Sequence, residues 1–442
     1  MKTLALAFFL LARIVFAQAS ASAETVPIST PTGANDTAVW VHPTDVSKSL
    51  VFGTDQLGGG LYSYALDGGL REFLNLGTTR AVDVRYGLKR GAGSTDVVVA
   101  VGVNGAYRLL APDPDDGGRL FFLDGAPTQS GSSVSAAALS VGSGDRSLMI
   151  YVSDFSGNLR HYQARDDGQG KLTPTLLRTL ALGAPVEGLV ADDRSDRLFL
   201  TLANRGLFVV GAANGSSTTP LLVDSLDAGR LAGAKGVALY YTADGGGYVI
   251  ASASQSSRFA VYALSSGFPF VTSFNLIADG GNKGATNTSG IDLVPISLGP
   301  PFNAGLFVAH DQNNVTGPNY KLVKWEAIAS STSPALAVDL RVDPRLGFFD
   351  AGAGDAGKPE GGTRCPLDAG AGDSGSMADS GTDSCQGTGG GSATAGPVGG
   401  GGPSGSGGGV AEPKGCSCSS AALLFPLAAL AGLIRRRSRA RA

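Results

Sequence analysis

Five acidic residues stand beside short apolar runs, where the chain enters or leaves strand-like segments. They are Asp36 in NDTAVWVHP, Asp83 in AVDVRY, Glu187 in VEGLVADD, Asp292 in SGIDL and Asp311 in AHDQNN. Taken singly, an acid in such a place caps or forms a turn. Several carboxylates converging on one point would instead offer the hard oxygen ligands that Ca²⁺ prefers. Both interpretations remain open at this level.

The sequence offers few cysteine or histidine residues for other kinds of catalysis. Cysteine occurs at only four positions, all after residue 360: Cys365, Cys385, Cys416 and Cys418. The first 360 residues therefore contain no disulfide, thiolate nucleophile or thiolate metal site. The three histidines are widely separated along the chain: His42, His161 and His310. A zinc site is not expected, and each histidine alone is consistent with a surface or hairpin position.

The charge is unevenly distributed. The 442 residues include 34 basic and 37 acidic ones, a net charge of −3. Seven basic residues and no acid lie in the first 23 and the last eight positions, which leaves a body with a net charge of −10. Such a body binds polyanions poorly by charge alone, so we expect no nucleic-acid partner. A phosphate-rich ligand would need metal ions as intermediaries.

The elements that must position the acids form a repeat. Between Glu24 and Leu346, short runs rich in Val, Leu, Tyr and Phe alternate with Gly, Asp, Asn and Ser, a pattern typical of short strands. Six hairpin-like units are present, and their second strands begin near Gly60, Gly105, Gly157, Gly206, Ser257 and Asn319. Six units of about 50 residues predict a six-bladed β-propeller, because a β-helix has a shorter period and a sandwich does not repeat.

The first 23 residues indicate a secretory signal peptide. Lys2 provides a basic start, Leu4 to Ala17 an apolar stretch interrupted by Arg13, and Ala21-Ser22-Ala23 a small-residue cleavage motif. A buried core helix is the alternative. We expect the propeller to occupy residues 24–347.

Residues 348–415 form a predicted flexible linker. The 65 residues from Ala351 to Gly415 include 23 glycines and almost no large apolar residue, so they cannot bury enough surface to fold. The linker repeats DAGAGDAG and DAGAGDSG, which could bind calcium weakly, although solvated low-complexity sequence is the favoured interpretation. Cys365 and Cys385 could form a disulfide outside the cell.

Residues 416–442 indicate a membrane-anchored end. Cys416 to Ile434 is 19 residues long, close to the ~20 that span a bilayer, and an arginine cluster follows it. Arginines after the span keep that end cytoplasmic and leave the body outside. The segment resembles the C-terminal sorting tail of myxobacterial surface proteins, which implies processing near Cys416 and retention at the cell surface. A plain membrane anchor is the alternative.

The body resembles the β-propeller phytases, which are secreted calcium-dependent phosphatases acting on myo-inositol hexakisphosphate. The resemblance rests on segments in conserved order: NDTAVWVHP, LGGGLYSYALDG, AVDVRY, VEGLVADD, GVALYYTADGGGYVIAS, SGIDLVPISLGPPFNAGLFVAHD and NYKLVKWEAIA. It implies that clustered calcium ions at a channel mouth neutralise substrate phosphates and activate a water molecule. It also implies that the metal ligands are the five acids named above, with no covalent enzyme intermediate.

Several positions depart from the family pattern. Lys235 replaces a metal-binding glutamate, and Leu202-Ala203 replaces a pair of glutamates. Asn104-Gly105 replaces an Asn-Arg pair, so a phosphate-binding cation is missing there. Arg85 and Lys235 are the candidate substrate contacts that remain. We therefore expect fewer calcium ions than in the family.

Two hypotheses follow for function. The first is a secreted, monomeric phosphatase of the 3-phytase type with a partly degenerate site, retained at the cell surface. The second is a non-catalytic surface propeller that binds a ligand or partner on the same face. A lactonase-like propeller hydrolase is a third and weaker alternative.

Overall fold

The computed structural model describes residues 17–91, 93–131, 133–141, 147–279 and 284–345. Contacts divide the chain into residues 1–358 and 359–442, and all described residues belong to the first unit. The predicted linker and C-terminal tail, and most of the predicted signal peptide, lie outside the described residues. Within the described residues, no helix is both long and apolar enough to cross a membrane.

Most strands are packed against other sheets on both faces, so their sequences are continuous apolar runs. One strand, for example, has fully buried side chains at successive positions, which point to opposite faces: Val97, Val98, Val99 and Val101. A strand covered on both faces has near-continuous apolar sequence, which explains why simple alternation is weak here. The polar residues between strands make turns; Asp154, for example, accepts hydrogen bonds from the N–H groups of Ser156 and Asn158.

The first three blades follow one another along the chain. Blade one contains β3 (Ala34–Trp40), β4 (Leu50–Asp55), β5 (Gly60–Ala65) and β6 (Leu70–Leu74). Blade two contains β7 (Thr79–Arg90), β8 (Gly93–Gly102), β9 (Ala106–Asp113) and β10 (Arg119–Phe122), with β11 (Thr128–Gln129) paired to β9. Blade three contains β12 (Val134–Val141), β13 (Leu148–Asp154), β14 (Asn158–Asp166) and β15 (Leu172–Ala181).

The last three blades include two strands from the N-terminal region. Blade four contains β16 (Val186–Asp192), β17 (Arg197–Leu202), β18 (Gly206–Gly211) and β19 (Leu221–Ser225). Blade five contains β20 (Ala234–Tyr241), β21 (Gly247–Ala253), β22 (Arg258–Ala263), β23 (Phe270–Ile277) and, beside β23, β1 (Ala17–Ser20). Blade six contains β24 (Ile291–Val294), β25 (Leu306–Asp311), β26 (Asn319–Lys324) and β2 (Ala23–Glu24).

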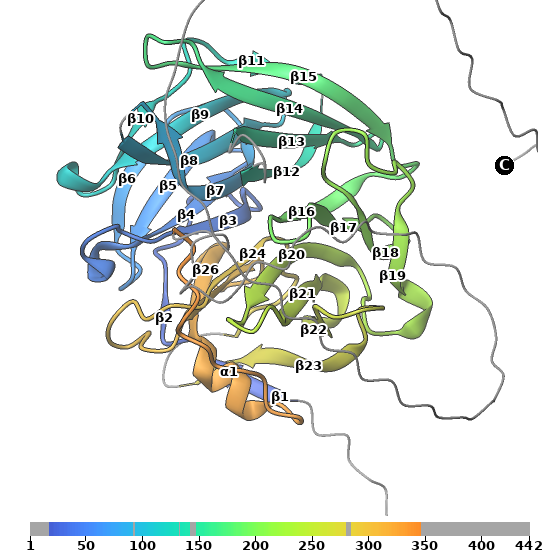
Figure 1. Ribbon diagram of the computed structural model, residues 1–442. Coiled ribbons are helices and arrows are strands. Elements are labelled where there is room, and N and C mark those ends of the chain that lie inside the picture. The colour runs from blue at the N-terminus through green and yellow to red at the C-terminus, as the bar shows by residue number, and fades with distance from the viewer. Residues whose placement is uncertain (1–16, 92, 132, 142–146, 280–283, 346–442) are drawn as a thin grey trace, which may run out of the picture. The chain divides into compact units, whose positions relative to one another are not determined.

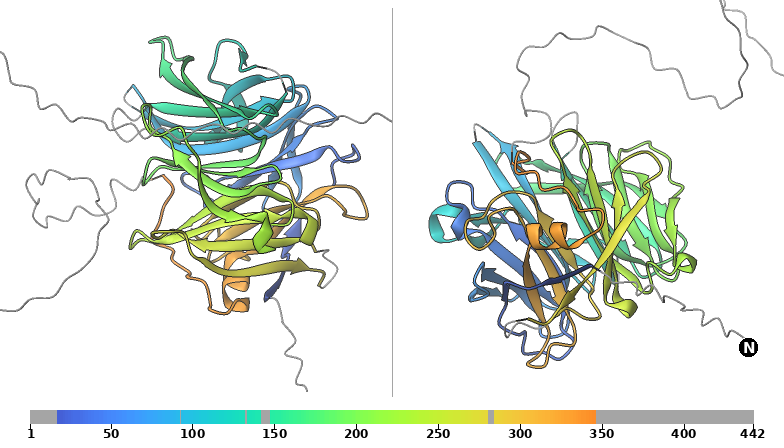
Figure 2. Two further views of the ribbon diagram at one scale, coloured as in Figure 1. Left: turned by 90° about the vertical axis from the view of Figure 1, so that its right-hand side faces the viewer. Right: turned by 90° about the horizontal axis from the view of Figure 1, so that it is seen from below.

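The six sheets close into a ring. The inner strands contact one another in the order β3, β7, β12, β16, β20 and β24, and β24 returns to β3. Figure 1 is viewed along the axis of the ring, and the inner strands lie near its centre. Figure 2 shows the same sheets from the side and from below. The predicted six-bladed, all-β propeller is confirmed, with one α-helix among the described residues, α1 (Trp325–Ser331).

Apolar clusters fill the space between neighbouring blades. Between blades two and three, Val99 and Val101 of β8 pack in the same cluster as Ala137 and Leu139 of β12. Each blade therefore completes its core only against its neighbours, so closure of the ring matters for stability.

The N-terminal region holds the ring closed. β2 is antiparallel to β26 and forms the outer strand of blade six, although β26 lies almost 300 residues away in sequence. β1 pairs in parallel with β23, and Ala19 and Ala21 are buried in the core that α1 also contacts. Figure 1 shows β1 beside β23 and α1. Cleavage after Ala23, as the small-residue motif predicts, would remove β1 and half of β2.

We therefore expect the mature chain to retain Ala17 to Ala23, with any processing upstream of Ala17. Deleting residues 17–22 should lower the free energy of unfolding by about 1 to 3 kcal/mol, because strand hydrogen bonds and two buried alanines are lost. Intact-mass measurement of the mature protein and thermal unfolding of both forms check this. A natural N-terminus at Glu24, with stability equal to the longer form, would contradict it.

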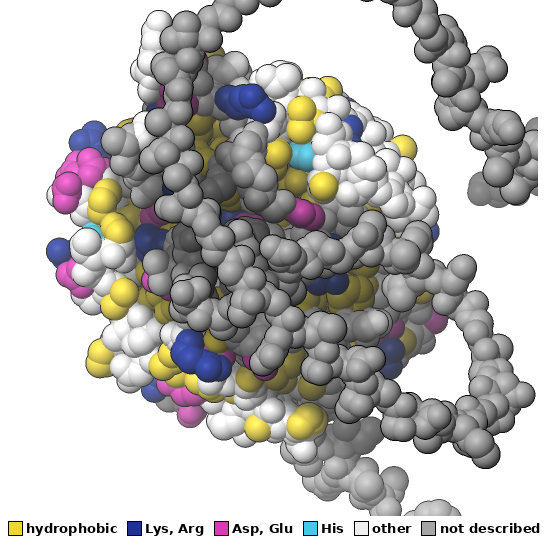
Figure 3. Space-filling view, viewed as in Figure 1, with side chains coloured by type: hydrophobic (Ala, Val, Ile, Leu, Met, Phe, Trp, Pro, Cys, Tyr) yellow, Lys and Arg dark blue, Asp and Glu magenta, His cyan; other side chains and the backbone are white. Residues whose placement is uncertain are grey.

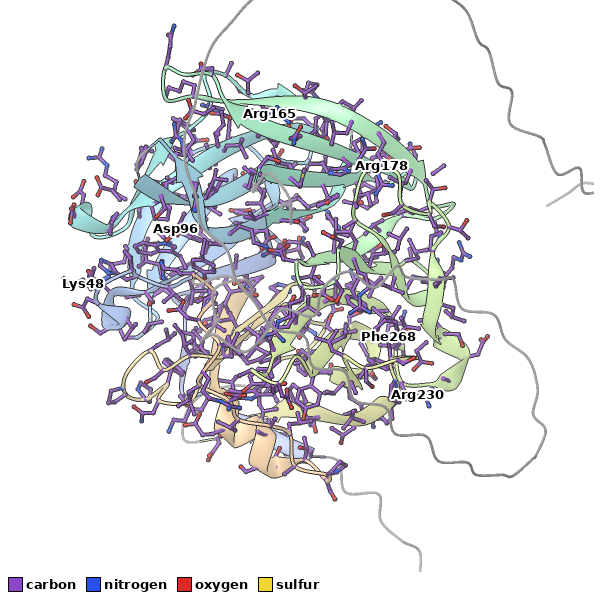
Figure 4. The ribbon with its side chains drawn as sticks, viewed as in Figure 1. Lys48, Asp96, Arg165, Arg178, Arg230 and Phe268 are labelled. Carbon is purple, nitrogen blue, oxygen red and sulfur yellow. The ribbon has the colours of Figure 1, made fainter. Side chains whose placement is uncertain are left out.

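A C-terminal segment covers one end of the channel. Tyr240 Oη accepts a hydrogen bond from Asp339 N–H, and the Asp339 carboxylate accepts one from Ala243 N–H. Val342 and Pro344 then line the channel, and Arg345 forms an ion pair with Asp96 of β8. Figure 4 labels Asp96 among the side chains of blade two.

Candidate functional site in the central channel

The central channel contains two chambers. Residues near the start of the inner strands line the first, here the N-end chamber, with a volume of about 40 Å³. Residues near the end of the same strands, with Val342 and Pro344, line the second, the C-end chamber, with a volume of about 100 Å³. Asp83 and Asp292 line both, so they stand where the two chambers meet.

Four of the five predicted metal ligands line the N-end chamber: Glu187 of β16 and three aspartates, Asp36 of β3, Asp83 of β7 and Asp292 of β24. Backbone N–H groups of neighbouring blades orient the three aspartates. Val82 N–H donates to Asp36 at 3.1 Å, Leu139 N–H to Asp83 at 2.7 Å, and Val39 N–H to Asp292 at 2.7 Å. Each carboxylate is thus held by the adjacent blade, and its position depends on ring closure.

The channel disfavours the ionised form of these acids. Burial, with smaller contributions from the charges of Asp83 and Asp292, raises the pKa of Asp36 to about 7. Burial, followed by the charge of Asp83, raises the pKa of Asp292 to about 7. The pKa of Asp83 is also raised by burial, although Arg85 opposes the shift. Three like charges in a poorly hydrated channel repel one another, so a proton or a cation is needed there.

Glu187 of β16 lines the N-end chamber and lies beside a cation, Arg80 of β7. Arg80 Nη2 is 3.9 Å from the Glu187 carboxylate, and Arg80 Nε donates to Ser135 O at 3.1 Å. The Arg80 guanidinium also bonds Gln56 Oε1 and lies 4.8 Å from the centre of the Phe155 ring. Arg80 is a functional candidate that the sequence reasoning missed, although its place at the start of an inner strand was a usable signal.

Lys235 of β20 is half-buried beside the N-end chamber, since the next residue, Gly236, lines it. Its carbonyl oxygen accepts a hydrogen bond from Thr201 Oγ1, which fixes the backbone of β20 against β17. Among the described residues its ammonium group has no ion-pair partner within 4.0 Å and makes no hydrogen bond. This placement leaves the predicted role in substrate binding open to test.

Arg85 lies in the other chamber. Its guanidinium is 3.3 Å from Asp83 and 3.4 Å from Asp193, and it donates to Ala191 O at 3.0 Å. Arg85 is thus surrounded by acceptors in the C-end chamber, whereas Lys235 lies beside the N-end chamber. The two candidate substrate contacts are not brought together.

Asp311 is also separate from the channel acids. It ends β25 and is 2% exposed at its side chain, and it forms an ion pair with Lys321 at 3.3 Å. Its carboxylate also accepts hydrogen bonds from the N–H groups of Thr286 and Asn313. Asp311 lines neither chamber. Its neighbours give it a structural role.

Two family departures have structural explanations. Gly105 has a φ of +89°, and a Cβ there would lie 1.9 Å from Gly131 O, so an arginine does not fit this turn. Leu202 is fully buried in the core between blades three and four. Neither position is available for a ligand-binding side chain in this fold.

Calcium fits the oxygen donors of the channel, and their mutual repulsion would be relieved by a cation. However, the described residues include no group of three Asp, Glu, His or Cys side chains close enough to hold one metal ion. An ion in this channel would therefore be held by at most two of these acids, with other ligands from water, backbone or substrate oxygens.

Comparison with known proteins identifies the family. The phytase family matches residues 11–347. A 3-phytase of Bacillus subtilis (strain 168) is 28% identical over 339 residues, covering 74% of this chain and 88% of that protein. The chain belongs to the phytase family.

Two solved structures were also compared. Both are crystal structures of BBS1N in complex with ARL6DN, soaked with lead or mercury. They are 14% and 13% identical with TM-scores of 0.40 and 0.41; they cover 65% and 67% of this chain, and it covers 78% and 80% of theirs. Values this low do not bear on fold or function.

Proposed function

We propose that this chain is a calcium-dependent phosphatase that hydrolyses phosphate monoesters of myo-inositol hexakisphosphate, in the manner of a 3-phytase, with fewer metal ions than its family. Its secretion and retention at the cell surface belong to the same proposal. Membership of the phytase family and the 3-phytase relative support the reaction class. The observation that carries the proposal is the meeting of Asp36, Asp83 and Asp292 in one channel.

Asp36 and Asp292 are the two acids that would hold calcium, because Asp83 already has Arg85 as a partner and Glu187 has Arg80. Bound calcium would neutralise substrate phosphate and lower the pKa of a water molecule. Arg80 and Lys235 supply positive charge beside the same chamber and would orient the phosphate groups. The narrow chamber admits little water, which strengthens these interactions.

A non-catalytic propeller is the second candidate, favoured by one observation. Arg80 lies beside Glu187, and Lys235 takes the place of a ligand, so two cations stand where the family holds metal. If they neutralise the acids fully, the site binds an anion without hydrolysing it.

Phosphate release from myo-inositol hexakisphosphate and from glycerol phosphate, in calcium or in EDTA, separates the two candidates. The wild-type protein should release phosphate in calcium alone. Asp36→Asn should lower kcat/KM by about 100-fold or more, because electrostatic contributions of this kind are typically worth 10²–10³ in rate. Asp227→Asn, an exposed acid of blade four, is the matched control and should retain the wild-type rate. No release from either ester in calcium would exclude the phosphatase.

A further inference from the structure

The segment that follows α1 crosses one end of the channel, from blade five to blades one and two. It begins at Leu336, which is 5% exposed in the core around α1, and the described part ends at Arg345. Between these points, Val342 and Pro344 line the C-end chamber, so the segment forms part of its wall. Its two ends are attached to the blades in different ways.

The blade-five end is attached by several hydrogen bonds. Ala337 N–H donates to Tyr248 Oη at 3.0 Å, and Asp339 N–H donates to Tyr240 Oη at 2.6 Å. The Asp339 carboxylate, 8% exposed at its side chain, accepts a hydrogen bond from Ala243 N–H at 2.9 Å. Detaching this end would remove the partners of two hydroxyl groups and a backbone N–H, which is costly.

The other end is attached by one side chain. The Arg345 guanidinium forms an ion pair with Asp96, labelled in Figure 4, and donates a hydrogen bond to Val41 O. Asp96 also accepts hydrogen bonds from Trp40 Nε1 at 2.8 Å and from Gly87 N–H at 3.0 Å. These two donors stay in place if Arg345 leaves, so this end can detach without depriving Asp96 of every partner.

The stretch between the two ends is held mainly by packing. Among the described residues, the stretch 340–344 makes no hydrogen bond to a blade, and Arg341 bonds back to Asp339. Val342 is 6% exposed, whereas Leu340 is 48% exposed. A stretch with few hydrogen bonds and few buried side chains opens at a much lower cost than the whole domain unfolds.

We propose that residues 340–345 form a releasable strap that gates the C-end chamber. Asp339 is its hinge, and the ion pair between Arg345 and Asp96 is its latch. When the latch opens, Val342 moves away from the chamber, and water and small solutes enter from this end.

The strap also connects the C-terminal part of the chain with the channel. Asp83 and Asp292 line both chambers, so opening the strap brings water to the same acids from the opposite side. The chain continues beyond Arg345, so a force or a binding event on residues 346–442 acts on the latch before it reaches the hinge. This gating is independent of whether the chain hydrolyses phosphate esters.

A cysteine introduced into each chamber reports which chamber opens. Leu239 lines the C-end chamber and Val237 the N-end chamber; both belong to β20, and they are 7% and 5% exposed. The alkylation rate with iodoacetamide is measured on the full-length chain carrying Leu239→Cys or Val237→Cys. Peptide mapping by mass spectrometry separates the introduced thiol from the four natural cysteines, which all lie after residue 360.

Arg345→Met should raise the alkylation rate at Leu239→Cys by about ten-fold or more, because the charge-assisted attachment of the strap is lost. It should leave the rate at Val237→Cys unchanged. Arg345→Lys retains the charge and should give a rate closer to that of the parent. Arg119→Met, at an exposed arginine of blade two, is the matched control and should change neither rate. A rise at both positions would mean that the whole ring loosens, and no rise at Leu239→Cys would mean that Arg345 does not hold a gate; either result overturns the proposal.

A second readout leaves the strap unchanged and so covers the case in which Arg345→Met folds poorly. With Arg345 present, alkylation at Leu239→Cys should depend little on urea below about 1 M, because opening a short strap exposes little surface. A steep increase with urea over this range would mean that the thiol is reached only through global unfolding, and the strap would then not be a gate.

Discussion

The metal-free protein is expected to lose about 2 to 4 kcal/mol of unfolding free energy as the pH rises from 5 to 8. The cause is the raised pKa of Asp36 and Asp292, each about 7 in the folded state against 3.8 as the reference value. Some solvent contact in the chamber makes the change smaller than the two full shifts would give.

The sign follows from proton binding. Between pH 4 and 7 the folded state binds more protons at these acids than the unfolded state, so raising the pH removes stability. The contribution is complete below the unfolded pKa and is lost as the pH passes the folded pKa. Asp339 has the opposite shift, because its pKa is lowered by the hydrogen bonds from Arg341 and Ala243, and its contribution changes below this window.

Asp36→Asn provides the matched comparison. The neutral amide keeps an oxygen acceptor for Val82 N–H but carries no charge, so the variant should be more stable than wild type at pH 8 in EDTA, and the difference should be much smaller at pH 5. Urea unfolding at both pH values measures the difference. The same substitution should abolish most phosphate release, so stability and activity would move in opposite directions. The interpretation would be refuted if the unfolding free energy of the wild type did not depend on pH, or if the variant were less stable than wild type at pH 8. Either result would mean that the ionised Asp36 carboxylate does not destabilise the folded protein.

Lys321→Met is expected to destabilise the protein by about 3 to 5 kcal/mol, because removing one partner of a buried ion pair leaves uncompensated charge. Lys321 is 0% exposed and lies between Glu24 of β2 and Asp311 of β25. The cluster therefore connects the N-terminal strand with blade six at the point where the ring closes.

A second substitution tests the cause. Lys321→Met combined with Asp311→Asn should recover part of the lost stability, since the acid left unpaired is neutralised. Lys48→Met is the control, because its ion pair with Asp45 is exposed and worth little. Thermal and urea unfolding report all three. A loss below about 1 kcal/mol for Lys321→Met would mean that this cluster does not hold the ring closed.

The channel brings together charged residues that lower stability and residues proposed to act in catalysis. The ring brings Asp36 and Asp292 together at a cost in stability, and it places Arg80 and Lys235 nearby. Figure 3 shows basic and acidic side chains interspersed among apolar ones on the described surface of one face. Inside the channel, the acids Asp36, Asp83, Glu187 and Asp292 line one chamber.

The architecture and the range of possible chemistry can be predicted from the residues alone. Six apolar hairpins with glycine-rich turns specify strands locally, because both the pattern and the turns are properties of neighbouring residues. The lack of cysteine before residue 360 and the acidic residues beside the strands were equally visible.

The tertiary structure decided which acids meet. Asp36 and Asp292 are 256 residues apart and become neighbours because β24 closes on β3, whereas Asp311, one strand farther out, meets Lys321. The role of β1 and β2 was also hidden, since a stretch of small residues before Glu24 has the same composition as a cleavage motif. Local pattern predicts strands; long-range pairing, which depends on ring closure, decides which side chains share a chamber.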